Sequence, residues 1–211
     1  MSSTKKTEQI PRKTIYRLSI YLRCLQKLSE NDMDTVSSGA LSKAAGVKST
    51  QLRKDLAYFG QFGTRGLGYN VQALADTISG VLGSNALQPV ILVGAGNLGS
   101  ALLRYNGFRK EGFEIKVAFD HDDHIVGTKR MGVPVRPSSE MEAFIKKNNV
   151  KMAILAVPSE AAQEIANTLV NAGVQGILNF SPTVLQVPSD VVVNAVDLAL
   201  ELEHLSYFVQ G

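Results

Sequence analysis

The stretch Val90-Ile-Leu-Val-Gly-Ala-Gly-Asn-Leu-Gly99 decides the fold predicted for this chain. An apolar run leads into Gly94-x-Gly96-x-x-Gly99, and residues 100–105 are typical of a helix. Between a strand and a helix, the first glycine permits a sharp turn, the second lets a pyrophosphate approach the backbone, and the third allows close packing. The helix N-terminus offers free N–H groups to the phosphates. We therefore predict a dinucleotide site at Gly94, Ala95, Gly96, Asn97, Leu98 and Gly99.

Strand-like and helix-like segments alternate after this turn. We expect further strands at residues 115–119, 133–135, 152–157, 176–179 and 191–196, and helices at 97–106, 139–148 and 160–172. Ser139 and Glu142 have the spacing of a capping box. The alternation predicts an α/β fold, a doubly wound parallel sheet of the Rossmann type. Ligands bind at the carboxyl ends of the strands in such sheets, where Val157 and Pro158 end the fourth strand and residues 179–182 follow the fifth.

Asp120 closes the second strand, 26 residues after Gly94. An acid at this position can bind the 2′-hydroxyl of the adenosine ribose and would repel the 2′-phosphate of NADP, so we expect NAD(H). We interpret the acids and histidines of residues 121–124 as solvated loop residues, with a metal site as the alternative. The chain has one cysteine, Cys24, which excludes an intrachain disulfide and a cysteine-based metal cage and fits a reducing cytoplasm.

Charge is distributed unevenly along the 211 residues. Residues 1–70 hold 12 Lys and Arg against 5 Asp and Glu, whereas residues 71–211 hold 10 against 14. A basic first part favours a module that binds nucleic acid, although solvated surface charge is the alternative. No apolar run approaches the roughly 20 residues that span a bilayer, and the first 20 residues are too polar for a signal peptide. We therefore expect a cytoplasmic protein without a membrane segment.

The first part of the chain has the pattern of a helix-turn-helix. A helix is expected from Pro11, a short second one that Ser38 caps and that stops at Gly46, and a third over residues 51–57. Ser49 or Thr50 is expected to cap the third helix. As a recognition helix it would present Gln to adenine, Arg to guanine and Lys to phosphate. The predicted DNA-binding residues are Ser49, Thr50, Gln51, Arg53 and Lys54. An ordinary amphipathic surface helix is the alternative.

Residues 58–69 contain four glycines between aromatic residues and favour a short hairpin with its tip at Thr64-Arg65-Gly66. After a recognition helix such a hairpin would be a wing, and Arg65 could enter a minor groove; a plain turn is the alternative. Asn70 is expected to cap a spacer helix that ends at Gly83. The predicted parts are a DNA-binding domain with its spacer helix at 1–84, a dinucleotide-binding domain at 85–196 and a C-terminal helix at 197–211.

The last helix, residues 197–209, carries an apolar stripe of Leu198, Leu202, Leu205 and Phe208 or Val209, which Leu200, Tyr207 and Phe208 widen. The stripe packs either on the chain's own sheet or on another chain. Only about 15 residues follow the sixth strand, too few for a substrate domain, and no catalytic group stands out at the sheet edge. We therefore expect no enzymatic activity; a nicotinamide-dependent dehydrogenase and a CoA-binding module of the same fold are the alternatives.

Several segments together resemble one family closely, namely Arg17-Leu-Ser-Ile-Tyr-Leu-Arg23, residues 51–70, Val93–Gly99, Tyr105-Asn-Gly-Phe108, Ala118-Phe-Asp120 and Val196–Leu202. They resemble the Rex family of redox-sensing transcriptional repressors over nearly the whole chain. The resemblance implies a homodimer with an N-terminal winged helix, a Rossmann domain that binds NADH and NAD+ as regulatory ligands, and a last helix exchanged between subunits. It also implies binding to palindromic double-stranded operators when NADH is low, release by NADH, and control of fermentation, anaerobic and respiratory genes.

The resemblance assigns roles to single residues as well. It places the glycine loop at the pyrophosphate, Asp120 at the adenosine ribose and Tyr105 near the nicotinamide. It pairs Arg17 with Asp197, which would couple the first helix to the ligand-binding region.

The resemblance to this family extends to the last helix and has two departures. Tyr207 and Phe208 are expected to join the coupling between subunits through the last helix. Ser19 stands where the family has Pro, and Asp122-Asp123 stands where Asp-Pro is common. The first departure bears on the start of the first helix and the second on the shape of a loop.

Overall fold

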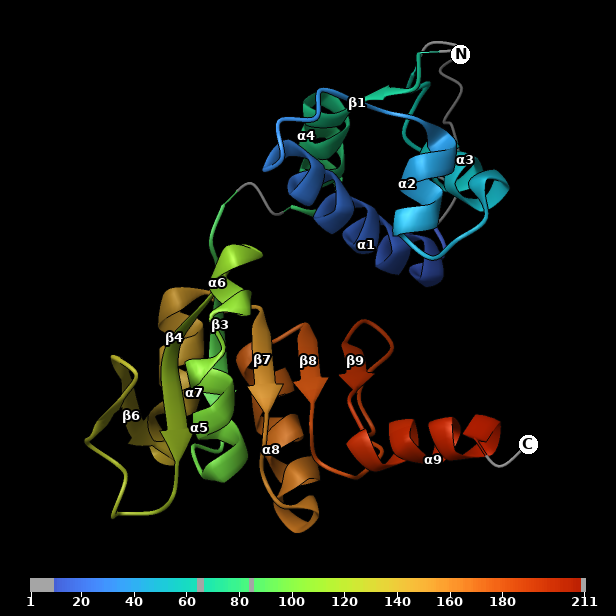
Figure 1. The fold of residues 1–211 in the computed structure, drawn as a ribbon. Helices are drawn as coiled ribbons and strands as arrows, with labels where there is room; N and C mark the ends of the chain where they lie inside the picture. The colour runs from blue at the N-terminus through green and yellow to red at the C-terminus, as the bar shows by residue number, and fades with distance from the viewer. Residues whose placement is uncertain (1–9, 64–66, 84–85, 210–211) are drawn as a thin grey trace, which may run out of the picture. The chain divides into compact units, whose positions relative to one another are not determined.

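The computed structural model describes residues 10–63, 67–83 and 86–209. The chain divides into two compact units, Met1–Ala86 and Leu87–Gly211 (Figure 1). The first unit contains α1 (Arg12–Ser29), β1 (Thr35–Val36), α2 (Ser38–Ala44), α3 (Ser49–Ala57), β2 (Tyr69–Asn70) and α4 (Val71–Leu82). Apolar residues at three- and four-residue spacing give α1 a buried face, including Leu18, Leu22 and Leu25, in the core of this unit. α2 and α3 pack together across a turn at Gly46, which has a φ of +66°, and so form the predicted helix-turn-helix.

The capping residues in this unit are as predicted for α4 and differ from the prediction for α2. The side chain of Asn70 caps α4 by accepting a hydrogen bond from the backbone three residues later, and α4 ends at Gly83, as expected. α2 is capped by Ser37 and not by Ser38, because Ser37 lies in extended backbone and its hydroxyl accepts the hydrogen bond from Ala40.

The hairpin expected at residues 58–69 has a different pairing. β2 pairs antiparallel with β1, and residues 58–63 contain no strand. The two arms still approach each other, because a side chain on Gly63 would collide with the carbonyl oxygen of Gly68. The strand partner was therefore wrongly predicted: it lies between the first two helices. The expected tip, residues 64–66 with Arg65, lies outside the described residues.

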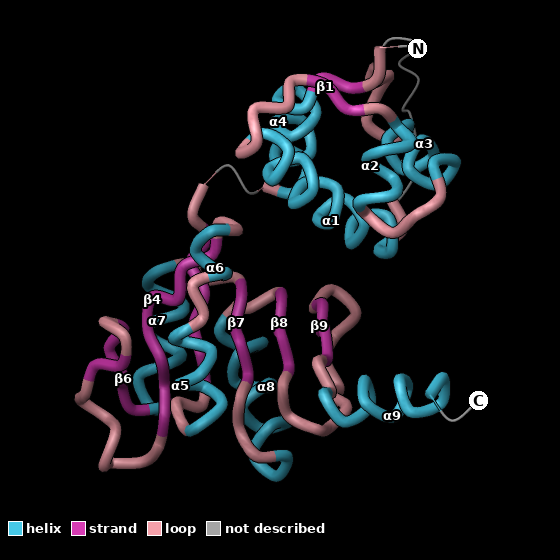
Figure 2. The backbone as a smooth tube through the Cα atoms, viewed as in Figure 1, coloured by secondary structure: helices cyan, strands magenta, loops and turns pink. Residues whose placement is uncertain are grey.

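The second unit is built on a seven-stranded sheet with the order β5-β6-β4-β3-β7-β8-β9 (Figure 2). Its strands are β3 (Gln88–Val93), β4 (Phe113–Asp120), β5 (Lys129–Arg130), β6 (Val133–Pro137), β7 (Met152–Leu155), β8 (Gly176–Asn179) and β9 (Val192–Ala195). All neighbours are parallel except β5 and β6. The parallel strands thus follow the order of a doubly wound dinucleotide-binding sheet, which confirms the predicted α/β fold.

Helices cover both faces of this sheet (Figure 1). α7 (Met141–Asn148) and α8 (Ser159–Ala172) lie on one face, while α5 (Asn97–Arg104) and α6 (Gly107–Lys110) lie on the other. Successive side chains of a strand point to opposite faces, so β3 contributes Ile91 and Val93 to one core and Val90 and Leu92 to the other. This double burial explains why the run before the glycine turn is apolar at every position.

The capping box expected at Ser139 and Glu142 is wrong. Residues Ser138–Glu140 form a 3-10 turn, η1, and α7 begins only at Met141 with no side-chain cap. The carboxylate of Glu142 pairs instead with Lys146, one turn further along the helix.

Candidate dinucleotide and DNA sites

The glycine loop joins β3 to α5 at the carboxyl edge of the sheet. Gly94 has a φ of +90°, and a methyl group on it would collide with the carbonyl oxygen of Ala156. A methyl group on Gly99 would collide with the carbonyl oxygen of Gly94. Nothing lies within 4 Å of the corresponding position at Gly96, so the backbone there is open to a ligand. The three glycines therefore do what the sequence pattern predicts for a turn, a close approach and a packing contact.

Asp120 at the end of β4 fixes this loop. Its carboxylate accepts hydrogen bonds from the backbone N–H groups of Ala95 at 2.6 Å, His121 at 2.7 Å and Asp122 at 3.0 Å. Burial alone would raise the pKa of Asp120, but these backbone hydrogen bonds outweigh it and hold the pKa below its usual value. Asp120 is therefore an ionised, oriented carboxylate beside the loop. A carboxylate has about four acceptor positions, so capacity remains for a ribose hydroxyl.

Ser100 and Arg130 hold the same loop from its other side. The hydroxyl of Ser100 donates to the carbonyl oxygen of Ala95 at 3.0 Å, and Arg130 of β5 donates to that hydroxyl. The backbone of Ala95 is thus fixed at its N–H group by Asp120 and at its carbonyl group by Ser100. Sequence reasoning missed both Ser100 and Arg130, because their partners lie up to 30 residues away.

A cavity of about 530 Å³ opens at this edge of the sheet. Its lining includes Gly94, Gly96, Asp120, Val157 and Pro158, which brings together the predicted loop, the predicted acid and the predicted end of the fourth strand. Asn97 and Leu98 lie in the exposed first turn of α5. A cavity of several hundred cubic ångströms with an anchored carboxylate and an open glycine backbone fits an adenine dinucleotide.

The wall of the cavity at Val157 is braced by a buried turn after β8. Ser181 is 5% exposed and its hydroxyl donates to the carbonyl oxygen of Val157 at 2.5 Å. Asn179 is fully buried, and its amide bonds the backbone of Ser181 and Thr183. The sequence places these residues at the sheet edge but gives no sign that they support its neighbour.

Tyr105 lies away from this cavity in its own chain. It follows α5 at the end opposite the glycine loop, is 59% exposed, and lines a separate hollow of about 390 Å³ with Phe108 and residues of β4. Its ring packs edge-to-face on Phe108 with the centroids 5.1 Å apart. The role near a nicotinamide therefore stays a prediction.

The recognition helix α3 presents only some of the residues predicted to face DNA. Thr50, Arg53 and Lys54 are exposed. Ser49 is half-buried and its hydroxyl lies 2.8 Å from that of Ser42, so it neither caps the helix nor points freely outward. The N-cap position belongs to Lys48, an exposed residue without a capping side-chain bond. The exposed basic face of α3 therefore begins one residue earlier than expected.

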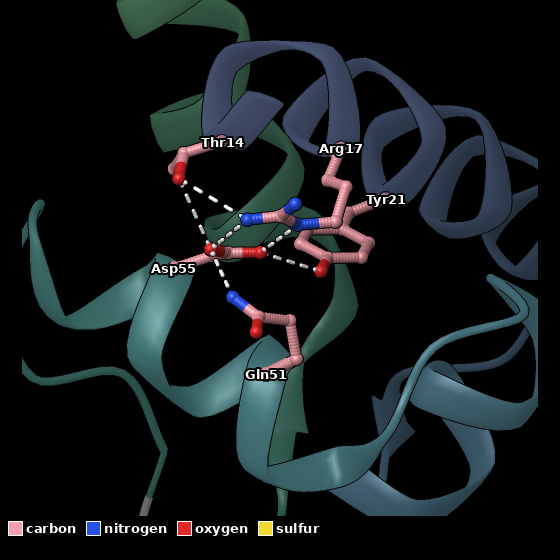
Figure 3. A network of polar contacts seen from close by, with 5 residues as sticks. All are labelled: Thr14, Arg17, Tyr21, Gln51 and Asp55. Atoms are coloured by element: carbon pink, nitrogen blue, oxygen red, sulfur yellow. Dashed lines mark hydrogen bonds and ion pairs between the residues drawn. The ribbon is translucent and has the colours of Figure 1, made fainter. Parts of the chain in front are cut away.

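Gln51 also turns inward, toward Asp55 one helical turn later. Its amide donates to the carboxylate of Asp55 at 2.9 Å, and Asp55 is 1% exposed (Figure 3). The same carboxylate receives Arg17 of α1 in a bidentate ion pair at 2.6 and 2.7 Å. Thr14 and Tyr21 of α1 complete its shell at 3.2 and 2.8 Å. Sequence reasoning missed Asp55 and so missed the partner of Arg17 within the first unit.

Asp197 and the last helix α9 (Leu198–Val209) lie in the second unit. The carboxylate of Asp197 caps α9 by accepting hydrogen bonds from Ala199 at 2.9 Å and Leu200 at 3.1 Å. No residue of α9 is buried, and Tyr207 and Phe208 are 78% and 67% exposed. α9 therefore does not pack on its own sheet, and the other alternative, packing on another chain, stays a prediction. The pairing of Arg17 with Asp197 stays a prediction, because the two residues belong to different units.

The described residues also bear on two other classes of site, membrane spans and metal sites. No helix there is long and apolar enough to cross a membrane. No group of three or more His, Cys, Asp or Glu side chains in that part of the chain is arranged to hold a metal ion.

Comparison with known proteins finds relatives along almost the entire chain. Residues 85–183 match the family described as "CoA binding domain", and residues 9–57 match the family described as "Putative DNA-binding protein N-terminus". The "Redox-sensing transcriptional repressor Rex" of Carboxydothermus hydrogenoformans is 50% identical over 202 residues, covering 96% of this chain and 97% of that protein.

Solved structures of RSP, a Rex-family repressor, are also similar. Its complex with beta-NADH is 38% identical with a TM-score of 0.85, over 95% of this chain and 94% of that one. Its complex with beta-NAD+ and operator DNA is 39% identical with a TM-score of 0.90, over 95% and 93% of the two chains.

Proposed function

Since this chain belongs to the Rex family of redox-sensing transcriptional repressors, we propose that it is a homodimer that binds palindromic operator DNA when NADH is low and leaves it when NADH binds. The observation that carries the proposal is 50% identity over nearly the full length to a redox-sensing repressor. The solved complexes of a Rex-family repressor with NADH, and with NAD+ and operator DNA, support it. The proposed targets are fermentation, anaerobic and respiratory genes, regulated in the cytoplasm.

The cavity at the glycine loop is the proposed site for NADH and NAD+. The open backbone at Gly96 and the N-terminus of α5 would receive the pyrophosphate. Asp120 would accept a hydrogen bond from the adenosine ribose, and its negative charge disfavours a 2′-phosphate. Val157 and Pro158 would form the wall at the far end of the site.

The coupling between ligand and DNA is proposed to run through Arg17, Tyr105 and Asp197. The bound nucleotide supplies the signal, because NAD+ and NADH differ by a hydride and one positive charge at the nicotinamide. A ligand shifts a conformational equilibrium only if it binds the two states differently. A hydrogen-bonded network of these three side chains, with one arrangement for each ligand state, would provide that difference.

The proposed dimer uses the exposed apolar residues of α9, including Tyr207 and Phe208, as an exchanged helix. A palindrome requires a fixed spacing between two recognition helices, so a small rotation of the two winged helices would release the operator. Thr50, Arg53 and Lys54 are the proposed DNA contacts on α3, together with Arg65. Ser49 and Gln51, predicted to contact DNA, would first have to leave their partners Ser42 and Asp55.

Fluorescence anisotropy on a palindromic A·T-rich operator tests the function, with NAD+ and NADH added separately. We expect NADH to weaken operator binding about 5- to 150-fold relative to NAD+, the usual range of allosteric coupling. Equal operator affinity in both nucleotides would contradict the proposal. Tyr105→Phe and Asp197→Asn, which keeps a capping oxygen for α9, should both reduce the effect of NADH. Asp190→Asn, on an exposed turn of the same unit, is the matched control.

The family match described as CoA binding is the specific observation that favours a second ligand. Competition of CoA against bound NADH tests it, and we expect NADH to remain bound because the carboxylate of Asp120 would repel the 3′-phosphate on the ribose of CoA. The relatives are named as repressors, and we propose no enzymatic activity; failure to oxidise NADH with a panel of small carbonyl compounds is the expected outcome.

A further inference from the structure

The carboxylate of Asp55 is the most heavily bonded buried group in the described part of the first unit. It is 1% exposed and accepts five hydrogen bonds, two from Arg17 and one each from Thr14, Tyr21 and Gln51 (Figure 3). Three of the four donor residues belong to α1, whereas Asp55 lies in the last turn of α3. The only cation among them is Arg17, so the charge of a buried acid on the recognition helix depends on a single residue of α1.

Arg17 is bound on one edge and open on the other. Its Nε and Nη2 atoms bond Asp55, Nη2 also bonds Thr14, and Nη1 has no hydrogen-bond partner among the described residues. The side chain is 21% exposed, so the outer edge of the guanidinium reaches the surface. A guanidinium has five N–H donors in a fixed plane, which lets one Arg bind two carboxylates at once or move between them. The geometry thus gives Arg17 an inner acid, Asp55, and room for an outer one.

We propose that Asp55 is the positioning residue through which Arg17 moves the recognition helix α3. This inference rests on the proposed function, in which Arg17 joins a hydrogen-bonded network with Asp197 that has one arrangement for each ligand state. A buried carboxylate that loses its only cation is strongly destabilised. When Arg17 shifts toward its outer partner, Asp55 therefore follows it and carries α3 along. Gln51 takes part in the same mechanism, because its amide donates a hydrogen bond to Asp55. It would face the bases of the operator only when that hydrogen bond breaks.

A purely structural Asp55 would do something different and measurable. If the ion pair only held α1 against α3, weakening it would lower operator affinity equally with NAD+ and with NADH. If the pair transmits the ligand state, weakening it changes the ratio of the two affinities. That ratio, and not operator affinity alone, is the decisive measurement.

The test compares the full-length protein with Asp55→Asn and with Asp76→Asn as a matched control. Asp76 lies on α4 and accepts a hydrogen bond at 2.8 Å from Gln72, four residues earlier, as Asp55 does from Gln51. Unlike Asp55, it is exposed and accepts no hydrogen bond from an arginine among the described residues. Operator affinity is measured by anisotropy with each nucleotide, NADH affinity by nucleotide fluorescence, and folding by thermal denaturation. We expect the affinity of Asp55→Asn for NADH, measured without DNA, to stay within about twofold of the wild-type value. The ratio of its operator affinity with NAD+ to its operator affinity with NADH should fall toward 1. Asp76→Asn should keep the wild-type ratio.

A retained ratio in folded Asp55→Asn would overturn the inference. If that variant does not fold, Tyr21→Phe takes its place, since it removes one hydrogen bond to Asp55 and leaves the ion pair and the apolar packing. A ratio at least threefold closer to 1 than wild type supports the inference, and an unchanged ratio overturns it. Failure of the proposed function has a different signature, because the wild-type protein itself would then show no dependence on NADH.

Discussion

The carboxylate of Asp120 has two roles, one toward the glycine loop and one toward the cavity. Three backbone N–H groups orient it against the glycine loop, and the remaining acceptor capacity faces the cavity. An amide in its place offers one acceptor oxygen, and its NH₂ group would oppose a backbone N–H. The loop and the ribose would therefore lose support together.

We expect Asp120→Asn to weaken NADH binding by about 10- to 100-fold, because a hydrogen bond to a charged group contributes roughly 1.5–3 kcal/mol. Titration of the protein's effect on NADH fluorescence measures this affinity. Asp190→Asn is the control, since Asp190 lies in the same unit, is exposed and does not line the cavity. Wild-type affinity in Asp120→Asn, or NADPH binding as tight as NADH in the wild type, would contradict the assignment.

Asp55 makes the first unit sensitive to acid. Burial opposes its ionisation, but hydrogen bonds from Arg17, Tyr21 and Gln51 outweigh burial and hold the pKa of Asp55 below its usual value. A folded-state pKa below the unfolded one gives stability that is present above the unfolded pKa and is lost as pH falls through the folded one. The contribution should therefore be complete at pH 7 and decline below about pH 4, the ordinary value for Asp.

Asp55→Asn should lower the free energy of unfolding by about 3 kcal/mol at pH 7, the usual cost of removing one partner of a buried ion pair. The difference between the variant and wild type should shrink as pH falls below 4. Urea denaturation followed by circular dichroism at pH 7, 5 and 3.5 measures it. A difference that stays constant over this range would show that the ionised form of Asp55 does not stabilise the fold.

A signal for the burial of Asp55 is present in the sequence. Leu52, Asp55 and Leu56 share one face of a helix by their spacing, and both leucines are buried. An acid on an apolar face needs a cation, but the cation lies 38 residues earlier, on another helix. Local pattern can therefore predict that Asp55 has a partner, and only the tertiary structure identifies Arg17.

At the scale of elements, the sequence predicts best where local chemistry and tertiary packing agree. The strands of the parallel sheet and the bounds of α4 follow from apolar runs, an Asn cap and a terminal Gly. β1 has two residues and is defined by its pairing with β2, so no run of residues could indicate it. The capping box at Ser139 fails because a 3-10 turn delays the start of α7 by two residues.

α9 is an element without a core of its own. Its exposed large apolar residues are Leu198, Leu200, Leu202, Leu205, Tyr207, Phe208 and Val209. An isolated helix of 12 residues is marginal in water, so α9 needs a partner surface. The proposed dimer supplies one and explains why a terminal helix can be apolar.

Leu202→Glu should therefore weaken the dimer. Burial of a leucine is worth about 1.5–3 kcal/mol, and each substitution counts twice in a symmetric dimer, so we expect at least a roughly 100-fold increase in the dissociation constant. Sedimentation equilibrium measures the dimer, and Glu203→Gln on the same helix is the control. An unchanged dimer, or a wild-type protein that sediments as a monomer, would exclude α9 as the interface.

At the scale of the whole molecule, the candidate nucleotide site and the candidate DNA-binding site lie in different units. The cavity with its glycine loop belongs to the second unit, and the helix-turn-helix belongs to the first. Neither unit contains both sites, so neither unit alone can make operator binding depend on NADH. The function proposed here requires a coupling free energy between two separate sites, and such a coupling acts equally in both directions.

Saturating operator should therefore weaken NADH binding by the same factor by which NADH weakens operator binding. We expect both factors to agree within experimental error, between about 5 and 150. NADH fluorescence titrations with and without the operator give one factor, operator anisotropy with and without NADH gives the other, and a scrambled duplex of equal length is the control. Unequal factors would mean that a third equilibrium, such as dissociation of the dimer through α9, accompanies release. Equal factors in the wild type together with a value near 1 in Asp55→Asn would locate the coupling at the contact between α1 and α3.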